Sequence, residues 1–397
     1  MFDDPLTRRN VFLLAICLAL MLSATSLVIT TSALVGVILA PKPIWATVPL
    51  AFMFLGSLIC AFPASLLMRQ VGRRAGFSFG LTFGLLGAIM SAFAVIEREF
   101  GLLCLGALFI GCFNGFGQFY RFAAADVAGE IYRARAISLV IAGGVIAALI
   151  GPTLANWSKD SLIAYPFAGS YICLVGLYLL SLILVSFLRI PKLKAEQRDE
   201  KGRLLMRIAL QPVFIVAALG AVSAYGVMNL VMTSTPLAMA TCGYSFSQTT
   251  FVFQGHMLGM YAPSFFTGHL IQRYGVTKIM FLGALLLAIC ILVNMHGETI
   301  VHFWMSLVLL GVGWNFLFIG GTTLVLESYH PAEKAKTQGL NDVLVFGTVA
   351  ITALSSGVLH QSVGWFTLNL SLLPVIFLTI IMVGWLHYVR PPKQLRT

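Results

Sequence analysis

Two pairs of side chains in the second half of the chain carry atoms that bind soft metal ions. Met228 and Met232 lie four residues apart, and His256 and Met260 have the same spacing. Because residues four apart share one face of an α-helix, each pair would point in one direction. Thioether sulfur and neutral imidazole nitrogen accept a soft cation such as Cu(I) and discriminate against magnesium and calcium. Four such groups on two adjacent helices could surround one ion and release it again.

Cys242 follows the first pair in the turn Thr241-Cys242-Gly243, where its thiol would act as an outer collecting ligand. Two other interpretations of these residues stay open. Methionine commonly fills gaps in apolar packing, so Met228 and Met232 would then be packing residues. An ionisable group at membrane depth usually faces a cavity or a partner, so His256 would then be a proton site or a hydrogen-bonded structural residue.

Acidic residues are scarce, and three of them lie at the ends of apolar stretches. Asp126 and Glu327 stand near such ends, and Asp342 stands near the start of another stretch. Arg121 precedes Asp126 by five residues, a spacing compatible with a local ion pair. We therefore expect a structural pair between Arg121 and Asp126, with Glu327 close to a gate.

The elements that must position these residues are membrane-spanning helices. The chain has 397 residues, of which 59% are hydrophobic and only 10% charged, and its mean hydropathy is +0.94. A soluble protein would carry about a quarter charged residues, so this apolar surface requires lipid as its solvent. A spanning helix needs about 20 mostly apolar residues. Twelve such stretches occur, at 11–36, 44–68, 75–96, 101–125, 136–157, 164–188, 207–239, 246–271, 277–295, 300–326, 337–360 and 366–388.

Basic residues gather in alternate loops, which predicts the orientation of the chain. If the N-terminus is cytoplasmic, the opposite face holds only Lys42, Arg98 and Lys159. The cytoplasmic face then holds Arg8, Arg9, Arg69, Arg73, Arg74, Arg133, Arg135, Arg273, Lys278, Lys334 and Lys336, with the basic segments 189–207 and 390–396. This asymmetry follows the positive-inside rule and places both termini in the cytoplasm. The net charge of +11 thus reflects the membrane orientation of the chain. The sequence has no basic stripe interleaved with exposed aromatic residues, so nucleic-acid binding is not indicated.

The most polar segment divides the chain into two groups of six helices. We expect an N-terminal half at 1–188, a cytoplasmic basic linker at 189–206 and a C-terminal half at 207–397. The halves match weakly at an offset near 200 residues, where the segment 65–73 aligns with 268–276 and Asn114 aligns with Asn315. Parallel repeats of this kind place a substrate site near mid-membrane between the halves.

The loop after the second helix carries the more specific signal. Together with the twelve predicted helices and the central basic loop, this segment makes the chain resemble the major facilitator superfamily. The family pattern in this loop is Gly-x-x-x-Asp-Arg-x-Gly-Arg-Arg, and it aligns with the residues from Ser65 to Arg74. Gly72, Arg73 and Arg74 match that pattern. Ser65 replaces the first glycine and Arg69 replaces the acid, so the usual carboxylate latch has no counterpart at that position. The resemblance implies an all-α membrane transporter with two pseudo-symmetric six-helix halves.

The two four-residue pairs, with Cys242 between them, resemble the CcoA-type bacterial copper importers. This resemblance implies a multi-pass protein of the bacterial inner membrane that imports copper as its substrate. Met228, Met232, His256 and Met260 would be ligands along the pathway, and the copper would supply cytochrome oxidase assembly. No permanently bound cofactor is implied, and partners would be lipid, the ion and copper carriers of the periplasm or cytoplasm.

Relatives in the same group resemble riboflavin carriers, which gives an alternative substrate. Aromatic and amide residues cluster in two stretches: Asn114 and Tyr120 lie among phenylalanines at 113–120, and Trp314 and Asn315 lie at 314–318. Stacking rings with a few amides would suit an isoalloxazine. The competing interpretation is that these rings face lipid or fill packing.

Other function classes lack their motifs. The sequence contains no Walker loop, GxSxG or HExxH, so neither ATP-driven transport nor an enzyme is indicated. No soluble signalling domain accompanies the helices, which disfavours a membrane sensor or assembly factor. The coupling ion stays open between a proton and uniport of a cation driven by the membrane potential.

Overall fold

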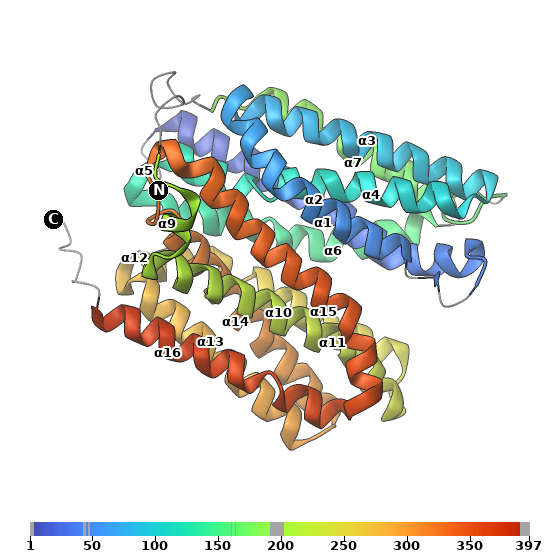
Figure 1. Ribbon diagram of the computed structural model, residues 1–397. Coiled ribbons are helices and arrows are strands. Elements are labelled where there is room, and N and C mark those ends of the chain that lie inside the picture. The colour runs from blue at the N-terminus through green and yellow to red at the C-terminus, as the bar shows by residue number, and fades with distance from the viewer. Residues whose placement is uncertain are drawn as a thin grey trace. The chain divides into compact units, whose positions relative to one another are not determined.

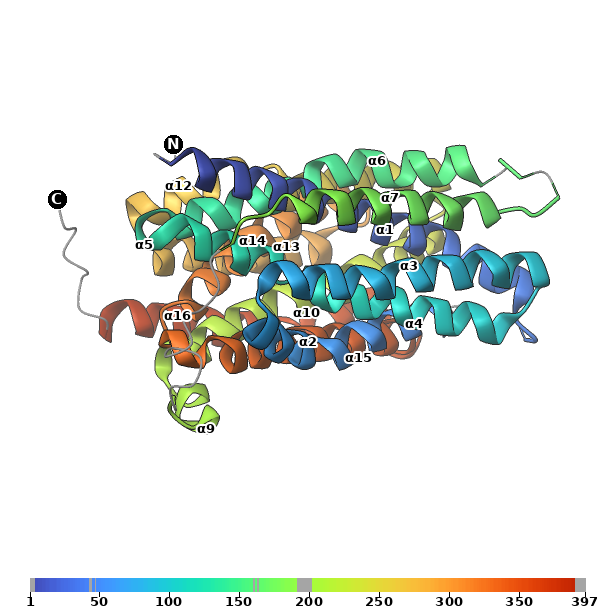
Figure 2. The ribbon, with the colours of Figure 1, turned by 90° about the horizontal axis from the view of Figure 1, so that it is seen from above.

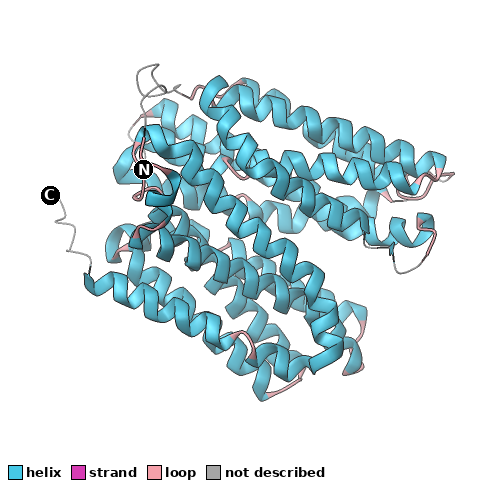
Figure 3. Ribbon diagram, in the orientation of Figure 1, coloured by secondary structure: helices cyan, strands magenta, loops and turns pink. Residues whose placement is uncertain are grey.

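The computed structural model describes residues 4–42, 45–46, 48–159, 161–162, 164–190 and 202–389, and these residues are largely helical (Figure 1). Loops join the helices, and no strand occurs within these ranges (Figure 3). The predicted all-α class is therefore confirmed. Most of the predicted basic linker at 189–206 falls on residues 191–201, which lie outside the described residues.

The chain forms two compact units, and unit 1 comprises Met1–Gly202 with His330–Ala350. Its helices are α1 (Pro5–Leu39), α2 (Val48–Val71), α3 (Arg73–Glu97), α4 (Phe100–Gly117), α5 (Tyr120–Ala142), α6 (Gly144–Ser158), α7 (Ala168–Ser186) and, after the 3-10 turn η2 (Pro331–Glu333), the first part of α15 (Lys334–Leu370). Helix α1 packs against α5 and α6, whereas α4 packs against α2 and α3 (Figure 2). Asp4 caps α1 by accepting the backbone N–H groups of Leu6 and Thr7.

Unit 2 comprises Arg203–Tyr329 and Ile351–Thr397. Its helices are α9 (Leu205–Ala209), α10 (Pro212–Thr241), α11 (Phe246–Tyr261), α12 (Ser264–Tyr274), α13 (Val276–His296), α14 (Ile300–Val325), the remainder of α15 and α16 (Leu373–Val389). Helix α14 is central to this unit, because α10, α11 and α13 all pack against it. Ser245 begins α11 through a capping box with Gln248.

Two glycines with positive φ interrupt long helices and account for the twelve predicted segments. Gly129 has φ +69° inside α5, and Gly364 has φ +76° inside α15. Within the described residues, nine helices are long and apolar enough to cross a membrane, and one of them, Phe100–Ser158, runs through two predicted stretches. The predicted stretches 246–271 and 337–360 correspond to α11 with α12, and to α15 before its break. The twelve-segment architecture is confirmed.

Equivalent loops in the two units share one backbone conformation. Gly72 lies between α2 and α3 with φ +88°, and Gly275 lies between α12 and α13 with φ +92°. These positions correspond in the alignment of 65–73 with 268–276. A residue with a Cβ atom is strained at such φ values, so glycine is required there. The helices around them pack alike, because α4 contacts α2 and α3 in unit 1 as α14 contacts α11 and α13 in unit 2.

Small residues let the central helix of each unit approach its neighbour closely. A Cβ atom on Gly111 of α4 would collide with the backbone of Met53 in α2. A Cβ atom on Gly311 of α14 would collide with the backbone of His256 and Met260 in α11. Such seams are typical of helix association in lipid, where close backbone packing replaces the hydrophobic effect as a driving force. The seam in unit 2 fixes where His256 lies along α14.

Candidate functional sites

His256 is held in one orientation by the backbone of α14. Its Nδ1 lies 2.8 Å from the carbonyl oxygen of Leu307, and the side chain is completely buried. Because a carbonyl only accepts, Nδ1 must carry the proton of the neutral ring. Nε2 is then an acceptor, and it has no hydrogen-bond partner among the described residues. The imidazole therefore offers one buried lone pair.

Met260 lies one turn after His256, at the junction of α11 and α12. Its carbonyl oxygen accepts a hydrogen bond from Asn315 Nδ2 at 2.6 Å. The same amide nitrogen donates to Ser264 Oγ at 2.5 Å, and Asn315 Oδ1 accepts from the Thr267 hydroxyl at 2.7 Å. Asn315 thus ties both parts of an interrupted helix to α14. The predicted pathway residue Asn315 has its side-chain oxygen and nitrogen engaged in this structural network.

Met228 and Met232 lie on α10, where the first is buried and the second half-buried. Helices α10 and α11 both pack against α14, which positions each of them. The convergence of the two methionines with His256 and Met260 on one ion therefore stays a prediction.

Cys242 ends α10 in an exposed turn, as the sequence indicated. Its Sγ lies 3.4 Å from Glu298 Oε2. Partial burial and the neighbouring Glu298 carboxylate raise the pKa of the Cys242 thiol above its ordinary value. Since the thiolate is the metal-binding form, this environment weakens Cys242 as a collecting ligand. Among the described residues, no group of three or more His, Cys, Asp or Glu side chains could hold a metal ion.

Trp314 is the centre of a buried aromatic cluster in unit 2. Phe318 stacks on its ring with centroids 4.9 Å apart, and Tyr225 and Tyr261 meet it edge-on at 5.3 and 6.0 Å. The cluster joins α10, α11 and α14. The indole nitrogen Nε1 of Trp314 is buried and has no hydrogen-bond partner among the described residues. A buried indole N–H usually finds an acceptor, so this donor is available to a ligand.

Asn114 and Tyr120, the predicted pathway residues of unit 1, lie on either side of the break between α4 and α5. The Thr25 hydroxyl of α1 lies 3.3 Å from Asn114 Oδ1, to which it donates. The Tyr120 ring contacts Phe77 with centroids 4.4 Å apart, and its buried hydroxyl has no hydrogen-bond partner in the described part of the chain. Both side chains are thus buried between the helices of unit 1 and do not lie on its outer surface.

Arg73 begins α3 directly after Gly72 and is buried, whereas Arg74 is exposed. Its Nε lies 3.2 Å from Asp126 Oδ2 of α5, and its Nη2 donates to Gln338 Oε1 at 2.6 Å. Asp126 Oδ2 also pairs with Lys334 Nζ at 2.5 Å. Asp126 thus places a carboxylate beside Arg73, in a loop whose sequence has Arg69 where the family pattern has an acid.

The predicted local pair between Arg121 and Asp126 is wrong. Arg121 Nη2 instead pairs with Asp342 Oδ1 at 2.5 Å, and Arg121 Nη1 donates to the carbonyl oxygen of Gln118. The reason is geometric: residues five apart on a helix do not share a face, whereas α15 brings its own side chains against that of Arg121. Glu327, the other acid singled out in the sequence, is half-buried just after α14, and its backbone N–H bonds to the Leu324 carbonyl oxygen.

Three residues of α15 at a spacing of four make these contacts. We call Lys334, Gln338 and Asp342 the α15 polar stripe; in unit 1 they meet Asp126, Arg73 and Arg121 respectively. The spacing places them on one helical face. Sequence reasoning noted Lys334 and Asp342 separately but missed the stripe, although the interval of four was a visible signal.

Comparison with known proteins decides the family. A riboflavin transporter, RfnT, of Brucella anthropi is 39% identical over 383 residues, which cover 96% of each chain. An uncharacterized MFS-type transporter, YddS, of Bacillus subtilis is 33% identical over 355 residues, covering 83% of this chain and 81% of the relative. The model of the Major Facilitator Superfamily matches residues 217–397. The chain belongs to the major facilitator superfamily.

The fold of this facilitator agrees with that assignment. The structure of the human organic anion transporter MFSD10 superposes with a TM-score of 0.78 and 16% identity, covering 96% of this chain and all of that one. The protein is therefore a multi-pass secondary transporter and not an enzyme, as the sequence predicted. The relatives named above do not point to copper, and the copper ligand set stays a prediction.

Two partners of this facilitator's candidate residues escaped sequence reasoning. Tyr225 joins the Trp314 cluster from α10, and Thr25 contacts Asn114 from α1. Neither residue stands in a recognisable motif. Tyr225 lies three residues before Met228, so α10 carries both the candidate thioether ligands and one ring of the aromatic cluster.

Proposed function

We propose that this facilitator transports riboflavin or a closely related flavin. The observation that carries the proposal is the 39% identity to a riboflavin transporter along 96% of both chains. Identity of that extent covers both six-helix halves and not a shared motif alone. The aromatic alternative raised from the sequence is thus favoured over copper import.

The Trp314 cluster supports a flat aromatic substrate. Edge-to-face and stacked rings each contribute about 0.5–1.5 kcal/mol beyond their buried area, so Tyr225, Tyr261 and Phe318 form a suitable wall for an isoalloxazine. The unpartnered indole N–H of Trp314 would donate to a ring carbonyl or nitrogen of the flavin. The lone pair of His256 would accept from a ribityl hydroxyl or the imide N–H.

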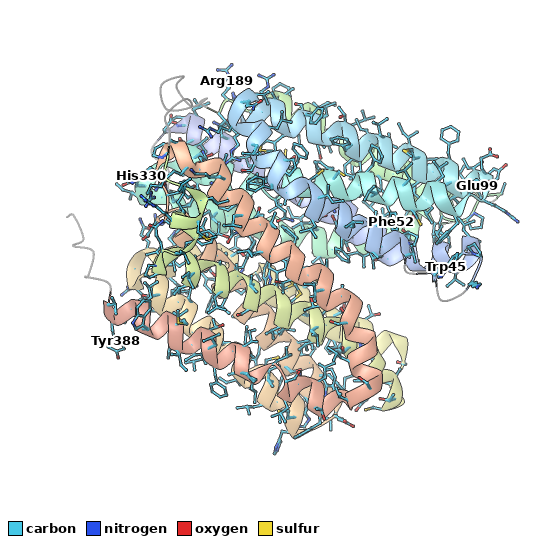
Figure 4. The ribbon with its side chains drawn as sticks, viewed as in Figure 1. Trp45, Phe52, Glu99, Arg189, His330 and Tyr388 are labelled. Atoms are coloured by element: carbon cyan, nitrogen blue, oxygen red, sulfur yellow. The ribbon has the colours of Figure 1, made fainter. Side chains whose placement is uncertain are left out.

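Orientation and mechanism complete the proposal. We assign import by alternating access between the halves 1–188 and 207–397, in the bacterial inner membrane with both termini cytoplasmic. In unit 1, Trp45 and Glu99 lie at one end of the helices, and Arg189 and His330 lie at the other (Figure 4). Helix α3 runs from Arg73 to Glu97, next to Glu99, so Arg73 begins the helix at the end opposite Glu99. The positive-inside rule supports our assignment of that end to the cytoplasm.

Copper import is the second candidate, and His256 favours it. A metal-binding histidine commonly donates its other ring N–H to a carbonyl, as Nδ1 does here toward Leu307. The thioether of Met260 lies one turn away on the same helix. Copper delivered in this way would serve cytochrome oxidase assembly, with copper carriers as partners.

Uptake measurements separate the two candidates. Cells lacking their own riboflavin uptake would be supplied with this protein and given labelled riboflavin or radioactive copper at limiting concentration. We expect riboflavin accumulation, inhibition by unlabelled flavin, and no change in copper content. Cells that accumulate copper but no riboflavin would reverse the order of the candidates.

A further inference from the structure

Two cysteines of unit 1 meet in the seam between α2 and α4, and the proposed flavin transport does not use them. Cys60 lies on α2 and Cys112 on α4, and both thiols are free and half-buried. The two thiols form a hydrogen bond with each other. Thiolate sulfur binds soft elements, so two thiols in contact offer a paired donor set.

Small residues bring the two backbones together at this point. A Cβ atom on Gly56, one turn before Cys60, would collide with the backbone nitrogen of Cys112. A Cβ atom on Gly115 would lie 3.2 Å from Cys60 Cβ. Ser57 Oγ donates across the seam, at 3.0 Å, to the carbonyl oxygen of the residue before Cys112. Close packing of this kind holds helices together in lipid, so the two sulfur atoms are kept side by side.

Two sulfur atoms are the whole donor set at this position. Among the described residues, no group of three or more His, Cys, Asp or Glu side chains could hold a metal ion. The next cysteine of α4, Cys104, lies eight residues before Cys112, which is about 12 Å along a helix. The bound element must therefore be satisfied by two sulfur ligands, which does not suit zinc with its four.

The surroundings of the pair favour a bound form without charge. Neither α2 nor α4 carries Asp, Glu, Lys, Arg or His within eight positions of its cysteine. A monovalent ion between two thiolates would keep one negative charge, which is costly at membrane depth. Trivalent arsenic that already carries one organic group forms a neutral product with two thiolates. The pair therefore suits such an arsenical better than it suits Cu(I).

We infer that Cys60 and Cys112 form a dithiol site for trivalent arsenicals that carry one organic group. Two S–H bonds break and two As–S bonds form, and the oxygen of the arsenical leaves with the two protons as water. No atom changes its oxidation state, so the step needs no oxidant or reductant. The product ties α2 to α4 within unit 1, whereas the Trp314 cluster belongs to unit 2.

Intact-mass measurement with phenylarsine oxide tests the site. The reduced protein in detergent would receive the arsenical and then an excess of the monothiol 2-mercaptoethanol. A monothiol displaces arsenic from a single cysteine, whereas a pair holds it through two bonds that must both be exchanged. We expect one adduct per chain that survives the monothiol and is released by the dithiol 2,3-dimercaptopropanol. Absence of an adduct, or its removal by the monothiol, would overturn the inference.

Serine variants identify the two sulfur atoms. Cys60→Ser and Cys112→Ser should each lose the monothiol-resistant adduct, because only one As–S bond can form. Cys173→Ser is the matched control and should keep it, since Cys173 is another half-buried free thiol, on α7 of the same unit. A resistant adduct in either of the first two variants contradicts the inference.

Digestion of the wild-type adduct gives an answer even if the serine variants do not fold. Arsenic should join the peptide that contains Cys60 to the peptide that contains Cys112, and a link between any other pair would overturn the inference. These measurements use no riboflavin, so their outcome is independent of the cargo.

Discussion

Arg121 and Asp342 are separated by 221 residues in the sequence and form an ion pair in unit 1 from which water is excluded. The pair joins α5 to the first part of α15. A second pair, between Asp126 and Lys334, joins the same two helices nearer the start of α15. Asp126 also pairs with Arg73, which follows the loop between α2 and α3 where the family pattern has an acid at the position of Arg69.

Removal of one partner from the dry pair should destabilise the protein more than removal of both. Arg121→Met removes the guanidinium that binds Asp342 Oδ1, and Asp342→Leu removes the carboxylate that binds Arg121 Nη2. Breaking a buried ion pair by removing one partner costs about 3–5 kcal/mol. The double variant should therefore unfold at a higher temperature in detergent than either single variant. Additive losses in the double variant would contradict the pairing.

Substitution of Trp314 should weaken flavin binding through its N–H. Trp314→Phe keeps an aromatic ring and removes the buried donor, so KM for riboflavin should rise by about tenfold or less, as expected for one hydrogen bond of about 0.5–1.5 kcal/mol. Trp304→Phe is the matched control, because Trp304 lies on the same helix with an exposed ring stacked on Phe251. Equal KM values for the two variants would remove Trp314 from the substrate site.

Met260→Leu distinguishes metal coordination from packing. The substitution keeps volume and apolar character and deletes the sulfur, and the Met260 backbone contact with Asn315 is unaffected. If the proposed flavin transport is correct, riboflavin uptake should stay near the wild-type level. A large loss of copper uptake with unchanged protein abundance would instead support the second candidate, and His256→Ala should then show the same loss.

Labelling of Cys242 tests both orientation and local electrostatics. An impermeant thiol reagent added to intact cells should modify Cys242, because the turn after α10 is assigned to the outer face. The pKa of this thiol is raised, so the reactive thiolate is scarce at neutral pH and labelling should accelerate as the pH increases. Glu298→Gln removes the neighbouring negative charge, which should lower that pKa and speed labelling at neutral pH. Modification only after the membrane is permeabilised would reverse the orientation.

Hydropathy and turn residues were sufficient to predict the helices, because lipid imposes a length and an apolar composition on each span. The partners of polar side chains were harder to predict from the sequence. The spacing of Lys334 and Asp342 indicates a shared face, but nothing in the sequence near Arg121 says that this face will meet it. The hydrogen bond from His256 to Leu307 could not be predicted for a different reason. Every residue carries a backbone carbonyl, so the residue type at position 307 does not indicate that its carbonyl accepts this bond.

The shared conformation at Gly72 and Gly275 has a consequence for tracing the ancestry of this chain. The second copy of the loop has lost the consecutive arginines, yet it bends at the corresponding residue. A neighbouring helix can supply a charged side chain that a loop lacks, as Asp126 does for Arg73. A φ value that strains every residue with a Cβ atom can be met only by glycine at that same position. Positions where a positive φ requires glycine should therefore still reveal an internal duplication after the functional side chains of the two copies have diverged.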